Sequence, residues 1–167
     1  GFIIEPEQAV VLRGPRLAGV IRQFFNDCLW EPLDYMIVDL PPGTGDVQLT
    51  LVQTVPVTGV IMVTTPQEVA LADAITGMTM FLLPSVNVPI LGVVEKMSWF
   101  TPAELPNNKY YLFGQGSGKK LAKASNSMLL GRVPIVQSIR DASDNGRPGV
   151  LSDEPIGRDA FMNVAKN

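Results

Sequence analysis

An apolar segment that runs directly into a proline- and glycine-rich turn is the feature that most constrains the fold of this chain. Residues 35–40 read Tyr-Met-Ile-Val-Asp-Leu, and residues 41–46 read Pro-Pro-Gly-Thr-Gly-Asp. The apolar run is typical of a buried strand of a parallel sheet. Such a strand would present Asp39 at its carboxyl end to hold a metal-bound water, and would bring the Gly43 N–H close to a phosphate. A plain connecting loop is the alternative interpretation.

Three further apolar runs alternate with amphipathic helical patterns along the chain. Strands are expected at Gly59 to Thr64, Ile90 to Val94 and Met128 to Val133, and helices from about Val47, Gln67 and Gly116 and after Pro155. Short strands that alternate with helices predict an α/β fold, and continuous apolar strands predict a parallel sheet covered on both faces.

A helix is also expected after Gly14-Pro15, because apolar residues recur there at helical spacing. This set is Leu17, Val20, Ile21, Phe24, Phe25, Cys28 and Leu29. Cys28 is the single cysteine, and its position in the set predicts a core residue rather than a metal ligand or a redox thiol.

The composition excludes several classes of chemistry. The chain has 167 residues, 46% of them hydrophobic, which is enough for the core of one domain. Without histidine it cannot build a Ser-His-Asp triad or a His-containing zinc site from its own residues. A net charge of −3 gives no electrostatic footprint for nucleic acid. No apolar run approaches the length of about 18 residues that a membrane span needs, so a cytoplasmic protein is expected.

Five matches give the chain a family resemblance. The longest runs from Asp39 to Gln48, with Leu49 after it, and the shorter ones are Arg13-Gly14-Pro15, Thr64-Thr65-Pro66-Gln67, Met97-Ser98-Trp99-Phe100 and Ser143-Asp144-Asn145-Gly146. On these residues the chain resembles the Mrp-type ATP-binding iron-sulfur cluster carriers of the deviant P-loop class, which also contains MinD and the nitrogenase iron protein. The resemblance implies a parallel sheet flanked by helices, of the MinD-like P-loop NTPase type, and a carrier that binds and hydrolyses ATP.

The resemblance also implies roles for the first turn. Asp39 is expected to be the Walker B type carboxylate that holds Mg²⁺ through a water, Gly43 to contact the γ-phosphate, and Asp46 to belong to a moving switch. The position of Asp46 before a predicted helix is equally consistent with an N-cap.

Ligands of open parallel sheets bind beyond the carboxyl ends of the strands, where the remaining candidate residues lie. Thr65 and Pro66 follow the second apolar run and are expected to shape the floor of the site, although a plain strand-to-helix turn explains them equally well. Pro134 follows the last run. Lys96 stands where relatives carry the asparagine that reads adenine, and lysine, which has only donors, cannot reproduce that paired contact.

The phosphate loop of the family, of the type GKGGVGKS, does not occur in these residues. Gly114 to Lys120 is the nearest imitation, but Phe113 stands where the first glycine must be, so a turn that caps a helix is the better interpretation. Residues 1–167 are therefore predicted to be the carboxyl-terminal part of a single P-loop NTPase-like domain, incomplete at its amino end. The parent protein is expected to be an ATPase, and this chain alone to be inactive.

The cluster site of the family is also altered. Many members carry Cys-x-x-Cys after the Met-Ser segment, whereas this chain reads Trp-Phe-Thr-Pro-Ala-Glu-Leu-Pro over residues 99–106. A [4Fe–4S] cluster is thus implied by resemblance only, because thiolates are what hold such clusters. Recipient apo-iron-sulfur proteins and a homodimer are the implied partners. The alternative function is a non-catalytic scaffold that retains the fold and uses the aromatic segment Trp99 to Tyr111 as an interaction surface.

Overall fold

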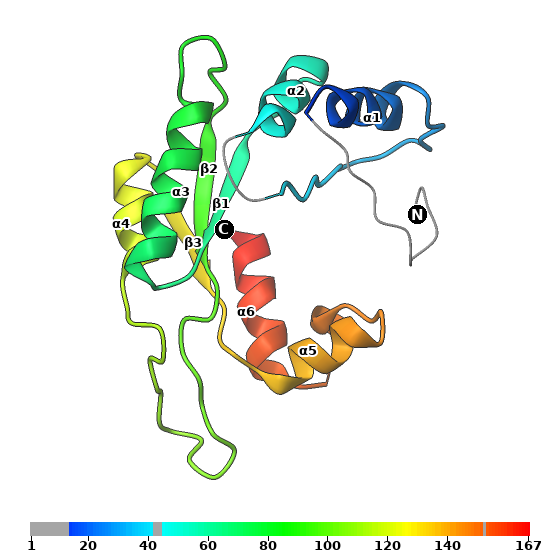
Figure 1. The fold of residues 1–167 in the computed structure, drawn as a ribbon. Helices are drawn as coiled ribbons and strands as arrows, with labels where there is room; N and C mark the ends of the chain where they lie inside the picture. Colours follow the sequence, from blue (N-terminus) through cyan, green and yellow to red (C-terminus); the bar gives the residue numbers. More distant parts are fainter. Residues whose placement is uncertain (1–13, 42–44, 152) are drawn as a thin grey trace. The chain divides into compact units, whose positions relative to one another are not determined.

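The computed structural model describes residues 14–41, 45–151 and 153–167, which form two compact units. The first unit is assigned to residues 1–57 and the second to residues 58–167; Figure 1 shows the helices and strands of the described residues.

A parallel sheet of three strands organises the second unit. Its order is β1 (Val60–Thr64), β2 (Ile90–Glu95) and β3 (Met128–Arg132), so neighbouring strands in the sheet are also consecutive along the chain. All three coincide with apolar runs of the sequence, and those three predictions are confirmed. Because parallel neighbours need a crossover connection, a helix follows β1 and another precedes β3.

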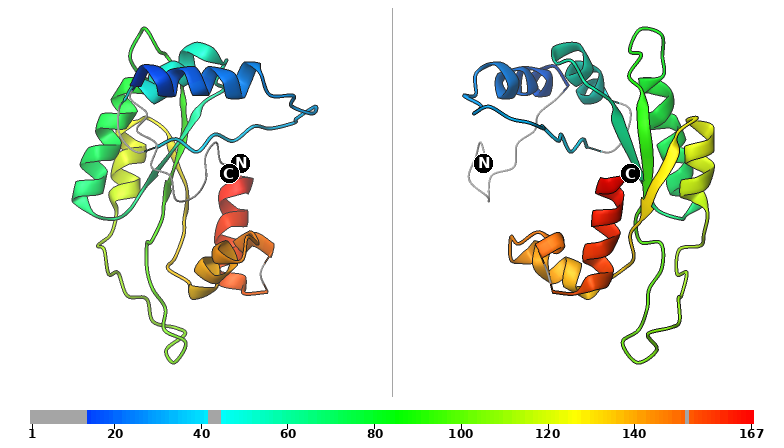
Figure 2. Two further views of the ribbon diagram at one scale, coloured as in Figure 1. Left: turned by 45° about the vertical axis from the view of Figure 1, so that its right-hand side comes forward. Right: turned by 180° about the vertical axis from the view of Figure 1, so that it is seen from behind.

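Helices cover the two faces of this sheet. The helices α3 (Glu68–Phe81) and α4 (Ser117–Ala124) lie on one face, and α6 (Pro155–Lys166) lies against β3 on the other (Figure 2). A Cβ added at Gly131 of β3 would lie 2.4 Å from Cγ2 of Val164, so α6 packs directly on the backbone of the strand. The helix α5 (Gln137–Asp144) and the 3-10 turn η1 (Gly149–Leu151) complete this end of the chain. The sequence pattern predicted α3, α4 and α6, whereas α5 was not predicted.

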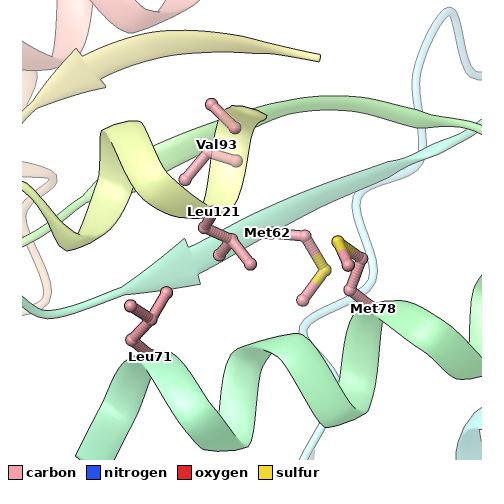
Figure 3. Close-up of a cluster of buried hydrophobic side chains, with 6 residues drawn as sticks. Met62, Leu71, Met78, Val93 and Leu121 are labelled. Carbon is pink, nitrogen blue, oxygen red and sulfur yellow. The ribbon is translucent and has the colours of Figure 1, made fainter. Parts of the chain in front are cut away.

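The core of the second unit lies between the sheet and the pair α3 and α4. Met62, Val93, Leu71, Met78, Leu121 and Ala122 form one buried cluster, most of which Figure 3 labels. Along β1 buried residues alternate with exposed ones: Met62 and Thr64 are buried, whereas Ile61 and Val63 are about half exposed. The expectation of a sheet covered on both faces therefore holds at β3, where α6 packs, and not along β1.

The first unit contains two helices that contact each other, α1 (Gly14–Asn26) and α2 (Asp46–Thr54). The helix predicted after Gly14-Pro15 is confirmed, but it ends at Asn26. Cys28 and Leu29 lie beyond that end and are exposed. The prediction that Cys28 is a core residue is wrong, because the helical spacing continues in the sequence after the helix itself has stopped.

The strand predicted at residues 35–40 is not formed. The segment has no backbone ladder to any strand of the described chain, and Tyr35 and Ile37 are 88% and 94% exposed. An apolar run becomes a strand only where a neighbouring strand takes up its N–H and C=O groups. Within the described residues this segment has no such neighbour.

None of the helices within the described ranges is long and apolar enough to span a bilayer.

Candidate functional site

The carboxyl ends of the three strands bring four of the predicted site residues to one edge of the sheet. Thr65 and Pro66 follow β1, Lys96 follows β2, and Pro134 comes two residues after β3. Two backbone hydrogen bonds align these ends: the Lys96 N–H donates to the Thr64 carbonyl at 2.9 Å, and the Val133 N–H donates to the Glu95 carbonyl at 2.8 Å. This is the edge at which parallel α/β sheets bind their ligands.

The four residues differ in what they offer to a ligand. Pro66 and Pro134 are buried and therefore shape the backbone of the edge. The half-buried Thr65 donates from its hydroxyl to Oε1 of Gln67 at 3.1 Å. The Lys96 side chain is exposed. Of these four, Lys96 supplies the charge.

A buried carboxylate that the sequence interpretation missed lies under this edge. Glu95 is 1% exposed, and both of its carboxylate oxygens accept hydrogen bonds. Its Oε1 accepts from Nε of Arg132 and from Oγ of Ser98, each at 3.0 Å, and its Oε2 accepts from the Gly118 N–H at 2.8 Å. A buried charge is tolerated when it is paired and fully hydrogen-bonded, as here. Glu95 thereby joins β2, β3 and α4 at their ligand-facing ends.

The start of α4 is fastened to the same edge. The Ser117 hydroxyl donates to the Pro66 carbonyl at 2.5 Å, and Gly118 donates to Glu95. The helix begins after Gly116, whose φ of 91° is the left-handed conformation that glycine adopts without strain.

Residues 114–120, which resemble a phosphate loop, thus form their contacts with other residues of the chain. A carboxylate of the chain accepts from the amide that would face a phosphate, and Lys120 forms an exposed ion pair with Glu68. The segment caps a helix, as the sequence interpretation preferred.

The segment from Trp99 to Tyr111 forms a loop whose base is closed on the sheet. Phe100 and Tyr110 are paired through two backbone hydrogen bonds of 2.8 Å, and the Ile135 N–H donates to the Trp99 carbonyl at 2.7 Å. The tip of this loop, residues 107–109, is exposed.

Two cations contact the indole of Trp99. The Lys109 ammonium lies 4.4 Å from the ring centroid and the Arg132 guanidinium 5.4 Å from it, and Arg132 also lies 5.9 Å from the ring of Tyr111. Such cation–π contacts stabilise an exposed loop modestly. Arg132 therefore links the base of the loop to the Glu95 carboxylate.

The predicted catalytic residues belong to the first unit. Asp39 is exposed, Gly43 lies outside the described residues, and Asp46 is the first residue of α2. The N-cap of α2 is Gly45, so the N-cap interpretation of Asp46 is wrong by one position. Gln48 closes the turn instead: its Oε1 accepts from the Gly45 N–H at 3.0 Å, and its Nε2 donates to the Pro41 carbonyl at 2.9 Å.

No cluster of three or more acidic, cysteine or histidine side chains suited to a metal ion occurs in residues 14–41, 45–151 and 153–167. Asp39 is a hard oxygen donor of the kind that Mg²⁺ accepts, usually with waters completing the shell. Iron-sulfur clusters require soft thiolates, and the sequence has one, Cys28. Asp39 thus offers Mg²⁺ one hard ligand, whereas one thiolate does not supply the ligands that a cluster held by this chain's own residues needs.

A parallel sheet with helices on both faces and polar residues at its strand ends is an α/β fold, and solved structures identify it as the P-loop NTPase-like type. A nucleotide-binding protein from Archaeoglobus fulgidus, solved in complex with ADP, superposes with a TM-score of 0.71 at 35% identity over 87% of this chain and 58% of that one. The cell division ATPase MinD of Pyrococcus furiosus superposes with a TM-score of 0.59 at 20% identity, covering 92% of this chain and 57% of that one. The second likeness shows the fold alone.

The particular family follows from the sequence comparisons. A family model described as ParA, NUBPL iron-transfer P-loop NTPase, matches residues 1–167, and the chain belongs to this family. The iron-sulfur cluster carrier protein of Synechocystis is 51% identical over 99% of this chain and 47% of its own length. The protein of the same name from Haemophilus influenzae is 43% identical over 99% of this chain and 44% of its own length. The chain thus spans about half the length of these relatives.

Proposed function

We propose that the protein containing this chain is an iron-sulfur cluster carrier that binds and hydrolyses ATP. The observation that carries the proposal is the family match over residues 1–167, which includes the whole block from Asp39 to Leu49. The relatives bear the name of cluster carriers, and a neighbour of 35% identity was solved with ADP. Residues 1–167 are taken as part of a P-loop NTPase-like domain of that protein.

The nucleotide is assigned to the edge formed by the strand ends. Thr65, Pro66 and Pro134 would form its floor, and Lys96 would donate to the base or to a phosphate. For the first unit, taken by itself, the family resemblance suggests separate roles: Asp39 to hold Mg²⁺ through a water, Gly43 to contact the γ-phosphate, and Asp46 to belong to a moving switch. Mg²⁺, when bound, neutralises charge on the phosphates.

The first experiment compares ATP turnover by the whole protein with turnover by residues 1–167. The whole protein is expected to hydrolyse ATP, and Asp39→Ala to reduce the rate at least tenfold, because removing the carboxylate weakens the hold on Mg²⁺. Residues 1–167 alone are expected to show none, since they contain no Walker A lysine. The matched control is Asp73→Ala, which removes an exposed carboxylate from α3. Turnover by the chain alone that disappears with Asp39→Ala would overturn the proposal of an inactive part.

The adenine contact has a separate test. Lys96→Asn in the whole protein supplies both a donor and an acceptor, and is expected to tighten the binding of adenine nucleotides in calorimetry. An unchanged dissociation constant would show that residue 96 does not contact the base.

Iron-sulfur clusters are proposed as the cargo, delivered to apo-proteins. The loop Trp99 to Tyr111 contains no thiolate, so a [4Fe–4S] cluster would need ligands that this loop does not provide. A homodimer and a cytoplasmic location are part of the same proposal. Reconstitution of the whole protein with iron and sulfide, followed by absorption spectroscopy, tests for cluster binding.

A non-catalytic scaffold is the second candidate, and the loop is the observation that favours it. Phe100, Leu105 and Tyr110 are each more than one third exposed on this segment. Absence of ATP binding by the whole protein would make the scaffold the better proposal.

A further inference from the structure

The turn that carries Lys96 has a strained backbone. Met97 has a φ of 56°, the left-handed region that residues with a Cβ rarely adopt. Strain of this kind persists only where the surrounding structure holds it, and it is concentrated at functional sites.

Hydrogen bonds hold this turn on both sides. Before Met97, the Lys96 N–H donates to the carbonyl of Thr64 in the neighbouring strand. After it, Ser98 is 1% exposed, its N–H donates to the Val133 carbonyl at 3.0 Å, and its hydroxyl lies 2.7 Å from the carbonyl and 3.0 Å from Oε1 of Glu95. The hydroxyl thus closes the turn from Glu95 to Ser98 at its two ends.

The Glu95 carboxylate is itself immobilised by Arg132 and by the first turn of α4. The closing hydroxyl therefore bonds to a rigid acceptor rather than to a mobile side chain. Within the part of the chain that the structure describes, the Lys96 ammonium has no hydrogen-bond or ion-pair partner. A fixed turn consequently presents an unpaired cation at the ligand-binding edge of a parallel sheet.

We propose that Ser98, together with Glu95, is a positioning residue that directs the Lys96 side chain toward the bound nucleotide and so sets nucleotide affinity and base selectivity. The inference rests on the proposed function, because it takes an adenine nucleotide as the ligand of this edge. It adds that the geometry of the turn, and not only the presence of a lysine, determines how strongly the nucleotide binds.

The test is a double-mutant cycle on the whole protein. Ser98→Ala removes the closing hydroxyl while Glu95 Oε1 keeps Arg132 and the Glu95 carbonyl keeps the Val133 N–H, so no buried acceptor loses its last donor. Dissociation constants for ATP and GTP are measured by calorimetry for Ser98→Ala, Lys96→Met and the double variant.

Ser98→Ala is expected to weaken ATP binding about three- to tenfold and to change the ratio of the ATP and GTP constants, as the loss of one well-placed hydrogen bond predicts. In the Lys96→Met background the same change is expected to have less than about a twofold effect. Ser125→Ala is the matched control. It removes a half-buried hydroxyl that bonds to the Leu121 carbonyl of α4, and it should leave both constants unchanged.

Each other outcome overturns the proposal in a recognisable way. An equal loss in both backgrounds would show that Ser98 acts on the fold and not through Lys96. No loss in either background would show that the turn does not position the lysine. Failure of the unsubstituted protein to bind ATP would overturn the proposed function as well, which distinguishes it from the first two results.

Discussion

Substituting Gly118 by alanine tests the close contact between the start of α4 and the Glu95 carboxylate. A Cβ at residue 118 would lie 2.8 Å from Cβ of Glu95, 3.0 Å from Cδ1 of Leu129 and 3.2 Å from Oε2 of Glu95. The first of these contacts is shorter than Cβ atoms tolerate, so Glu95 must move and its hydrogen bond from the Gly118 N–H must lengthen.

The magnitude follows from two opposing effects. Alanine in place of a helical glycine stabilises by about 0.5–1 kcal/mol, whereas overpacking a closed site costs about 1–3 kcal/mol. Weakening a hydrogen bond to a buried carboxylate adds about 1 kcal/mol or more. We therefore expect Gly118→Ala to lower the free energy of unfolding by about 2 kcal/mol.

Urea unfolding followed by far-ultraviolet circular dichroism measures this change. The matched control is Gly77→Ala in α3, where the new Cβ would have Cε of Met62 at 3.9 Å, an ordinary contact. Gly77→Ala gains the higher helix propensity of alanine without a steric clash, so its free energy of unfolding should be about 0.5–1 kcal/mol higher than that of the unsubstituted chain. Equal stabilisation by both alanines would refute the contact between α4 and Glu95.

Three further predictions concern the core, a turn and the cysteine. Leu121 is 0% exposed, so Leu121→Ala should lower the free energy of unfolding by about 3–5 kcal/mol in the same assay. Leu112 is 61% exposed, so Leu112→Ala should lower it by less than about 1 kcal/mol. Similar losses for the two variants would contradict the described core. Asn126 has a φ of 50°, so Asn126→Gly should be neutral or stabilising, and Asn126→Ala should destabilise the protein by about 1 kcal/mol. If the alanine variant had the higher thermal midpoint, residue 126 would not have the left-handed conformation. Cys28 is exposed, so a thiol reagent should label it fully without denaturant, and protection would restore the core interpretation.

The sheet and its covering helices could be predicted from the sequence, because their signals are local. The runs Gly59 to Thr64, Ile90 to Val94 and Met128 to Val133 are apolar, short and separated by helical patterns, and each became a strand. The run at residues 35–40 carries the same signal but does not form a strand, because strand formation also depends on a partner strand that no local pattern specifies. The prediction that Cys28 is a core residue was wrong for a related reason, because helical spacing in a sequence does not show where the helix ends.

The candidate site was predicted in part. Strand-end positions identified Thr65, Pro66, Lys96 and Pro134, and the structure places all four at one edge. Glu95 was missed, because glutamate is almost never buried unless it is paired, and its partners come from residues as distant as Arg132. The available signal was a carboxylate at the end of an apolar strand, with a serine three residues later and an arginine at the end of the next strand.

The closed base of the loop from Trp99 to Tyr111 has a consequence for how such proteins diverge. Phe100 and Tyr110 are bonded to each other and Ser98 is bonded to the sheet, so the backbone of the loop is closed at its base, and Lys109 contacts the ring of Trp99 just inside that closure. Doubling the length of a flexible loop costs only about 0.6 kcal/mol in closure entropy. Insertions, deletions and exchanged recognition sequences at residues 101–108 should therefore be tolerated, so evolution can rewrite this tip without rebuilding the strand ends.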